Sequence, residues 1–285
     1  MSVTADNPST LAHGRPEIGV DVLAGGVRTN VLMAGEGDPV VLVHGSGPGV
    51  TAYANWRLTI PALAERMRVI APDMLGFGFT ERLDPPTVCD TDRWVRHLVD
   101  LLDALDLPTV SLVGNSFGGG IALRLAARHP DRVKRLVLMG SVGVPFDITR
   151  GLDAVWGYQP SFSYMRSLLD IFAYSRELVS DELAEVRYRA SIEPGFQEAF
   201  SALFPPPRQR WVDEMATPAD EIRRITHETL VVHGRDDQVI PLQNSLQLLQ
   251  LLPHAQLHVF GRCGHWTQIE WAQQFNRLVG DFLTA

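Results

Sequence analysis

A serine, an acid and a histidine, the residue types that together perform nucleophilic catalysis, occur in this order along the chain. Ser116 is the centre of the sequence G-N-S-F-G, which stands between an apolar run and a helix-compatible segment. A serine hydroxyl becomes an effective nucleophile when an imidazole takes its proton and a buried carboxylate orients that imidazole. Asp237 and His265 each follow a later apolar run. We therefore predict that Ser116, His265 and Asp237 form a catalytic triad.

Other acids and histidines compete for two of these roles. Asp236 is adjacent to Asp237, but Asp237 is preferred because it stands four residues before Pro241, the usual spacing for the acid of such a triad. His44 is interpreted as a structural residue of a glycine-rich loop, and His233 as a residue at the end of a strand. Among the histidines, His265 fits the chain order of the triad.

Glycines around Ser116 predict a sharp turn between a strand and a helix. A side chain at Gly114 or Gly118 would collide with neighbouring backbone in such a turn, which holds its central residue in a strained conformation. The helix that follows would present the backbone N–H of Phe117 to a developing oxyanion. A second N–H is expected from the glycine-rich loop at residues 44–49, donated by Gly45 or Ser46.

Alternating apolar runs and amphipathic segments predict an α/β fold with a doubly wound, mostly parallel sheet. The predicted strands are residues 19–23, 28–34, 40–43, 68–71, 110–113, 133–139, 229–232 and 256–260. The predicted helices are residues 55–66, 90–105, 121–128, 218–225, 242–252 and 268–283. Because ligands bind at the carboxyl ends of strands in such sheets, the three triad candidates are expected to meet there.

Residues 144–212 interrupt this alternation. The segment is rich in aromatic residues and resembles helix around residues 164–174 and 181–191. We expect residues 1–143 and 213–285 to form the core domain, with residues 144–212 forming a helical cap inserted after the sixth strand. Its side chains should shape part of the binding pocket, and the candidates are Phe146, Leu152, Trp156 and Ile192.

Composition narrows the class of partner. The 285-residue chain has a net charge of −8 and no basic stripe, which argues against nucleic acid, although a local arginine can still bind an anionic small molecule. Its two cysteines indicate neither a disulfide framework nor a metal centre. No apolar run reaches the roughly 18–20 residues of a membrane span. Residues 1–16 are polar and are predicted to be a loose arm without a signal peptide, so we expect a cytoplasmic protein.

These motifs together resemble the α/β-hydrolase superfamily over nearly the whole chain. More narrowly, the chain resembles the meta-cleavage-product hydrolases of bacterial aromatic degradation, in particular the members with alkyl-type substrates such as the isopropylbenzene-pathway and 2-hydroxymuconate-semialdehyde hydrolases. The matching segments are S-G-P-G at 46–49, N-W at 55–56, Asn115, R-Y at 187–188, and Trp266 directly after the histidine.

The resemblance implies hydrolysis of a C–C bond in a 2-hydroxy-6-oxo-2,4-dienoate, without a cofactor or metal, in a homo-oligomer. It implies that Arg187 binds the substrate carboxylate, with Arg189 as the alternative. It further implies that Asn55, Asn115 and Trp266 hold the oxygen at C2 and that Ser46 contacts the substrate. Two other functions remain open at this point: a carboxylesterase or lactonase of the same fold, and a non-catalytic ligand-binding receptor. The sequence does not indicate the preferred C6 substituent.

Overall fold

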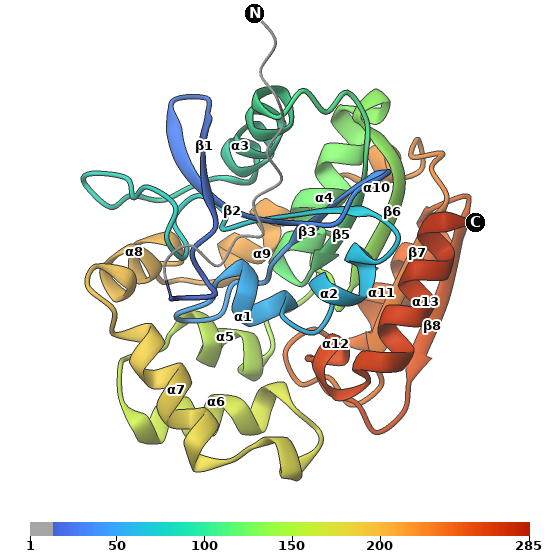
Figure 1. Cartoon of the computed structure of the whole chain (residues 1–285). Helices are drawn as coiled ribbons and strands as arrows, with labels where there is room; N and C mark the ends of the chain where they lie inside the picture. The colour runs from blue at the N-terminus through green and yellow to red at the C-terminus, as the bar shows by residue number, and fades with distance from the viewer. Residues whose placement is uncertain (1–13) are drawn as a thin grey trace, which may run out of the picture.

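An eight-stranded sheet forms the centre of the protein, with the strand order β1-β2-β4-β3-β5-β6-β7-β8 (Figure 1). The computed structural model describes residues 14–285, so most of the predicted N-terminal arm lies outside the described residues. The strands are β1 (Val20–Ala24), β2 (Val27–Ala34), β3 (Pro39–Val43), β4 (Arg68–Pro72), β5 (Val110–Asn115), β6 (Val133–Met139), β7 (Thr229–Gly234) and β8 (Ala255–Phe260). The β1–β2 and β2–β4 pairs are antiparallel and the remaining pairs are parallel, which confirms the predicted fold class.

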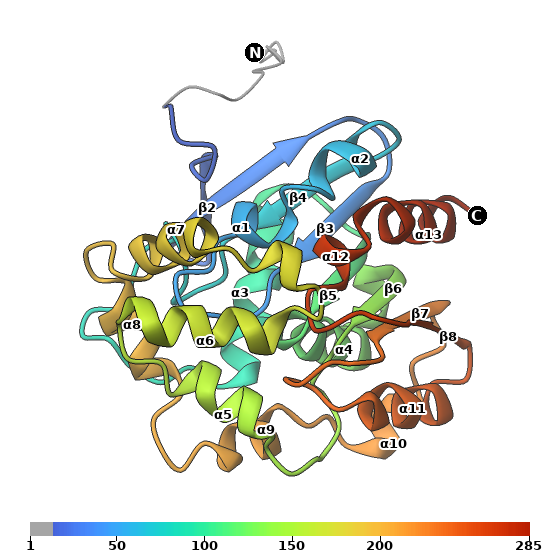
Figure 2. The ribbon, with the colours of Figure 1, turned by 90° about the horizontal axis from the view of Figure 1, so that it is seen from below.

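Helices cover both faces of the sheet, as continuous apolar strands require. The two faces are visible in the view from below (Figure 2). One face packs against α3 (Thr91–Ala104), α4 (Phe117–Arg128) and α11 (Leu242–Leu251). The other face packs against α1 (Ala52–Trp56), α2 (Ile60–Ala64) and α13 (Ala272–Thr284). The short helix α10 (Ala219–Ile222) lies against α4, and α12 (Thr267–Glu270) precedes α13.

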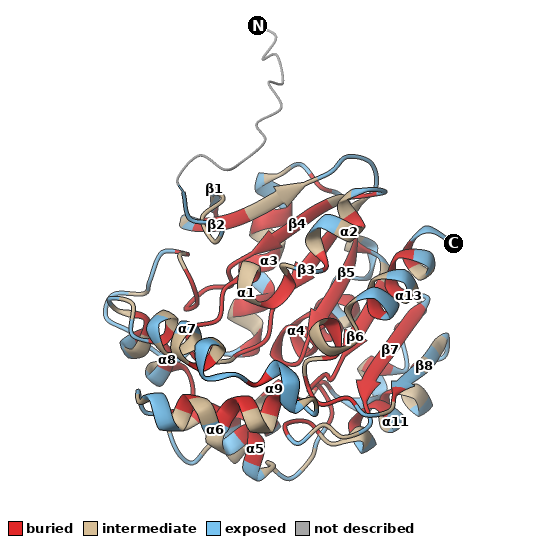
Figure 3. Ribbon diagram, turned by 60° about the horizontal axis from the view of Figure 1, so that its bottom comes forward, coloured by how far each residue is buried: buried red, intermediate tan, exposed pale blue. Residues whose placement is uncertain are grey.

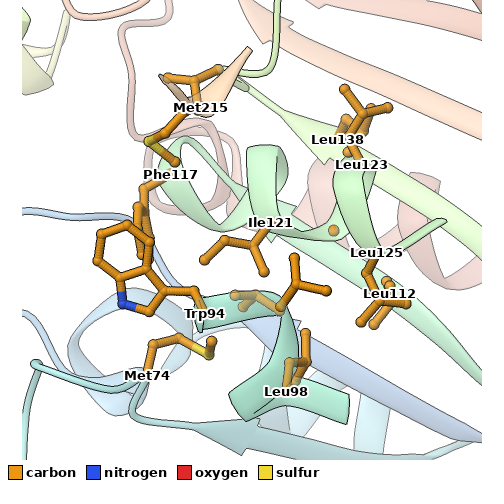
Figure 4. Close-up of a cluster of buried hydrophobic side chains, with 14 of the residues drawn as sticks. Met74, Trp94, Leu98, Leu112, Phe117, Ile121, Leu123, Leu125, Leu138 and Met215 are labelled. Atoms are coloured by element: carbon orange, nitrogen blue, oxygen red, sulfur yellow. The ribbon is translucent and has the colours of Figure 1, made fainter. Parts of the chain in front are cut away.

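Strand β3 contributes side chains to the hydrophobic clusters on both faces of the sheet. Val41 and Val43 belong to the apolar cluster on the α3–α4 face, whereas Val40 and Leu42 belong to the cluster on the α13 face, because successive side chains of a strand point to opposite sides. The centre of the sheet is accordingly buried while the outer helix faces are exposed (Figure 3). Figure 4 shows part of the first cluster, where Trp94 and Phe117 lie side by side.

The segment between β6 and β7 is helical. It contains α5 (Arg150–Trp156), α6 (Phe162–Phe172), α7 (Asp181–Ser191), α8 (Phe196–Leu203) and α9 (Gln209–Met215). Serine or threonine side chains cap the first three of these helices: Thr149, Ser161 and Ser180 each accept a hydrogen bond from a backbone N–H of the first turn. In Figure 1, α5, α6 and α7 lie together below the sheet.

Two predicted helices are each broken into two. The predicted helix at residues 55–66 is α1 and α2, because Pro61 lacks an N–H and fits only in the first turn of a helix, so a new helix starts just before it. The predicted helix at residues 268–283 is α12 and α13, interrupted at Trp271. The Trp271 ring stacks on Phe260 at 5.8 Å, a tertiary contact that helical periodicity does not reveal. None of the helices described between residues 14 and 285 combines the length and apolar character needed to cross a membrane.

Candidate active site

Ser116 occupies the turn between β5 and α4 with a φ of 55° and a ψ of −115°. This conformation is strained for a residue with a side chain and persists because its surroundings fix it. The Ser116 N–H donates to the Met139 carbonyl at 2.8 Å. A Cβ at Gly114 would lie 2.5 Å from the Gly118 carbonyl oxygen, and one at Gly118 would lie 2.3 Å from the Val43 carbonyl oxygen. The turn therefore requires both glycines, as predicted.

Asp237 and His265 are hydrogen-bonded beyond the ends of β7 and β8. The Nδ1 atom of His265 donates to Oδ2 of Asp237 at 2.7 Å. The other carboxylate oxygen, Oδ1, accepts from the backbone N–H groups of Val239 at 2.7 Å and Ile240 at 3.0 Å. With Nδ1 protonated in this bond, Nε2 of His265 is the atom that can accept a proton. His265 and Ser116 line the same cavity.

Electrostatics keep Asp237 ionised. Burial by itself would raise the pKa of this carboxyl, since only 1% of the side chain is exposed. The charge and hydrogen bond of His265, together with His233 and the Ile240 N–H, outweigh burial and hold the pKa of Asp237 below its usual range. The carboxylate can therefore orient the imidazole and stabilise its protonated form.

Asp236 and His233, which were the alternatives for the acid and the base, form hydrogen bonds with other groups. Asp236 accepts from the Cys263 N–H at 3.3 Å and pairs with Arg235. Buried His233 contacts the Ser245 hydroxyl through Nδ1 at 2.7 Å and the Ile240 carbonyl through Nε2 at 3.0 Å.

His44 is also fully engaged. Its Nε2 accepts from the Met74 N–H at 2.9 Å and its Nδ1 donates to the Gly45 carbonyl at 2.7 Å. Burial lowers the pKa of His44 to about 4, so the ring is neutral near pH 7. Both ring nitrogens therefore serve to position the glycine-rich loop, and neither is available to Ser116.

The loop after β3 carries both candidates for the second oxyanion donor, and their hydrogen bonds differ. The Gly45 N–H donates to Oδ1 of Asn55 at 3.1 Å, so it is not available to a substrate oxygen. The structure therefore contradicts the Gly45 alternative and leaves the N–H of Ser46. Among residues 14–285, the backbone N–H groups of Ser46 and Phe117 donate to no other group. The Ser46 hydroxyl accepts from the indole N–H of Trp156 at 2.9 Å.

A cavity of about 300 Å³ lies between the core and the inserted helices. Its lining includes every residue predicted to bind the substrate: Ser46, Asn55, Asn115, Arg187 and Trp266. Apolar side chains cover another part of the wall, among them Leu152, Val155, Phe172 and Val239. A cavity with an apolar wall and a few converging polar groups is typical of a small-molecule site.

Arg187 is the cation of α7 that reaches this cavity. Its Nη2 donates to the Pro48 carbonyl at 3.1 Å. Burial, and then the nearby charge of Arg57, lower the pKa of Arg187 to about 10, which leaves the guanidinium charged at neutral pH. Arg189, the alternative, is exposed and paired with Glu185 at 2.6 Å, outside the cavity lining.

The candidate ligands for the C2 oxygen lie near the nucleophile. The Asn115 amide donates to the Met139 carbonyl at 3.4 Å. The Trp266 ring stacks on Phe172 with centroids 4.9 Å apart and planes inclined by 9°, so it packs as well as lining the cavity. Its indole N–H has no hydrogen-bond partner among residues 14–285 and remains available.

Several lining residues carry no signal in the sequence. Phe172 at the end of α6 accepts from the His265 N–H at 2.7 Å through its carbonyl, which ties the inserted helices to the histidine loop. Arg57, Glu177 and Gln268 also line the cavity. Of the four side chains expected to shape the pocket, only Leu152 lines it. Trp156 contacts Ser46 instead, Phe146 packs in the core, and Ile192 is exposed.

Comparison with known proteins identifies the family. Residues 38–272 match the model of the alpha/beta hydrolase fold. The chain is 64% identical over 94% of its length to the 2-hydroxymuconate semialdehyde hydrolase of Pseudomonas sp. (strain CF600), of which it covers 94%. It is 63% identical, again over 94% of its length, to the 2-hydroxy-6-oxo-2,4-heptadienoate hydrolase of Pseudomonas putida, of which it covers 97%.

A solved structure supports the same assignment. The meta-cleavage product hydrolase CumD from Pseudomonas fluorescens, in a serine-to-alanine mutant complexed with acetates, superimposes with a TM-score of 0.93. It is 59% identical, and the match covers 95% of this chain and 99% of that one. This protein therefore belongs to the α/β-hydrolase fold family and, within it, to the meta-cleavage-product hydrolases.

Proposed function

We propose that this protein hydrolyses the C5–C6 bond of a 2-hydroxy-6-oxo-2,4-dienoate, giving 2-hydroxypenta-2,4-dienoate and a small carboxylic acid. The observation that carries the proposal is one cavity lined by Ser116, His265 and the charged guanidinium of Arg187. A nucleophile for the ketone and a cation for the carboxylate are both needed at the two ends of this substrate. A neutral ester needs only the first.

Binding would orient the substrate along the cavity. Arg187 offers planar N–H donors that match a carboxylate. Asn55, Asn115 and the Trp266 indole, which line the same cavity, would hold the oxygen at C2, and Ser46 would contact the substrate near C6. The C6 carbonyl would then lie at Ser116, within reach of the N–H groups of Phe117 and Ser46.

The reaction needs a leaving group, which the dienol supplies after tautomerisation. Loss of the proton on the C2 oxygen and addition of a proton at C5 give a 2-oxo form in which C5 can depart as a stabilised enolate. Ser116 Oγ attacks C6 as His265 takes its proton, and the oxyanion is held by the two N–H groups. The C5–C6 bond breaks with its electron pair staying on the dienolate, and His265 returns its proton to the dienolate oxygen at C2 as 2-hydroxypenta-2,4-dienoate leaves. His265 then takes a proton from water, the hydroxide attacks the acyl carbon, and that proton passes to Ser116 Oγ as the acid departs.

The inserted helices would act as a cap. We propose that residues 144–212 form a lid over the core of residues 1–143 and 213–285. Support comes from Leu152, Phe172 and Arg187 of this segment, which line the same cavity as Ser116. A homo-oligomer, which the resemblance implies, stays a proposal that light scattering after size exclusion would test. A cytoplasmic location is consistent with the two buried free cysteines, Cys89 and Cys263.

The C6 substituent is proposed to be small, namely hydrogen or methyl. Support comes from the relatives named for a semialdehyde and a heptadienoate. The apolar side chains of Leu152, Val155 and Val239 would contact this group.

The test is kcat/KM across dienoates with hydrogen, methyl, isopropyl and phenyl at C6, followed through loss of the visible dienolate absorbance. We expect turnover of the first two to be fastest and Ser116→Ala to abolish it. Simple esters are tested as alternative substrates, and a serine-directed phosphonate is tested for labelling of Ser116. An enzyme that hydrolyses esters but no dienoate is an esterase, and a protein that neither turns over a dienoate nor is labelled at Ser116 is not this hydrolase.

A further inference from the structure

A second arginine lines the same cavity as Arg187. Arg57 lies just after α1, and its Nη1 donates to the Ala54 carbonyl at 3.0 Å. Among residues 14–285, no carboxylate lies within 4 Å of the guanidinium of either arginine, whereas the neighbouring Arg189 is paired with Glu185. Two cations thus share one cavity, and neither forms an ion pair with a carboxylate among the described residues.

The repulsion between Arg57 and Arg187 is not offset by an ion pair with a carboxylate among the described residues. Arg57 lies close enough for its charge to contribute to the lowered pKa of Arg187, after burial. The ionisable groups that face the cavity from other elements are Glu177, which is exposed and unpaired among the described residues, and His265, whose carboxylate partner is Asp237. Like charges that repel in a partly buried site favour binding of an anion.

We propose that Arg57 is a second ligand of the anionic head of the substrate and that, with Arg187, it selects the doubly charged form. This inference rests on the proposed function. In that form the carboxylate and the oxygen at C2 each carry a negative charge, and the C2 hydroxyl proton has left to solvent. Two guanidinium groups match two adjacent anionic oxygens, whereas one would leave half of the charge unpaired.

The pairing has a spectroscopic consequence. A cation beside the C2 oxygen stabilises its ionised state, so the bound dienol should ionise at a lower pH than the free dienol. The ionised dienolate absorbs in the visible range and can be observed directly. Removing Arg57 should weaken binding and should also raise the pH at which the bound ligand ionises.

The experiment uses Ser116→Ala, which retains the cavity but lacks the nucleophile. The 6-methyl dienoate is titrated into S116A, S116A/R57Q, S116A/R57K and S116A/R189Q at several pH values. We expect R57Q to weaken binding by about tenfold or more, the loss of a charge-assisted hydrogen bond. R57Q should also shift the ionisation of the bound ligand to higher pH, and R57K should restore part of both effects. R189Q is the matched control on α7 and should change neither.

Unchanged affinity and ionisation in R57Q overturn the inference, as does an equal loss in R189Q. Weaker binding without a shift in ionisation retains Arg57 as a ligand and overturns selection of the doubly charged form. Failure of the proposed function is seen separately, because S116A with both arginines intact would then bind no dienoate and the wild-type protein would turn none over.

Discussion

The indole N–H of Trp156 donates to the hydroxyl of Ser46 at 2.9 Å, joining an inserted helix to the loop after β3. Both side chains are buried, and the Trp156 ring stacks flat on Phe204 with centroids 4.4 Å apart. Ser46 also carries the backbone N–H that we assign to the oxyanion. The hydrogen bond therefore links the position of α5 to the position of an oxyanion donor.

Trp156→Phe should lower kcat by about tenfold and change KM less. Phenylalanine retains an aromatic ring against Phe204 but cannot donate to Ser46, so the loop loses one restraint. Displacing an oxyanion donor affects the transition state more than the bound ground state; removal of a donor outright costs roughly 10²–10³ in kcat in other enzymes. Steady-state kinetics with the 6-methyl dienoate measure both constants.

Ser46→Ala and the double variant test whether the effect passes through this hydrogen bond. If it does, the losses in the two single variants are not additive, because each removes the same contact. Additive losses, or a loss confined to KM, would show that Trp156 acts on the cavity by another route.

Asp237→Asn should lower kcat by roughly 10³-fold or more, as loss of the triad carboxylate does in other serine enzymes. An amide cannot hold His265 with the Nδ1 proton toward it and also stabilise the positive imidazolium. Asp236→Asn is the matched control, since Asp236 is the adjacent acid and faces the Cys263 N–H instead. Comparable losses in both variants, measured by kcat on correctly folded protein, would refute the assignment of Asp237.

Chain order and turn chemistry were sufficient to predict that Ser116, Asp237 and His265 follow three strands of a parallel sheet, because each stands in the turn or loop after one of those strands. Strand positions were likewise predictable from short apolar runs bounded by glycine, proline or charge. Helix continuity was not predictable in two places. Pro61 gave a local signal for one break, whereas the break at Trp271 depends on contacts with residues that are distant in the sequence.

Contacts between the core and the inserted helices could not be predicted from the sequence either, because they also join residues that are distant in the sequence. Arg57 and Arg187 are far apart in the sequence, and the packing of α7 against the loop after β3 brings them to one cavity. The preference for Ser46 over Gly45 also required the structure. Only the fold shows that the Asn55 amide oxygen already accepts from the Gly45 N–H.

Gly118→Ala should abolish activity and destabilise the protein. The added Cβ would lie 2.3 Å from the Val43 carbonyl oxygen and 2.5 Å from that of His44, and backbone cannot move aside cheaply. Gly47→Ala is the control, because its Cβ would lie 3.8 Å from the Phe172 ring, an ordinary contact. Thermal unfolding compares the two, and an unchanged melting temperature for G118A would show that the turn tolerates a side chain.

Acid should destabilise the protein between about pH 6.5 and pH 4. Burial lowers the pKa of His44 and of His97 to about 4 in the folded protein. As the pH falls, these histidines are therefore protonated first in the unfolded chain. Protonation stabilises the unfolded chain relative to the folded protein. Asp73 opposes this trend, because burial raises its pKa to about 6 and the folded state then binds that proton first. The two histidines contribute more to the pH dependence than the one carboxyl, so the free energy of unfolding should fall as the pH is lowered.

His97→Gln separates these contributions. Glutamine can keep a hydrogen bond to the Thr29 hydroxyl, which lies 2.8 Å from Nε2 of His97, but it binds no proton in this range. The free energy of unfolding in urea, measured at pH 7 and pH 5, should fall by roughly 2 kcal/mol less in H97Q than in the wild type, the linkage expected for one buried histidine over that interval. A pH dependence that is identical in both proteins would mean that His97 takes up its proton equally in the folded and unfolded states, and that the acid sensitivity arises elsewhere.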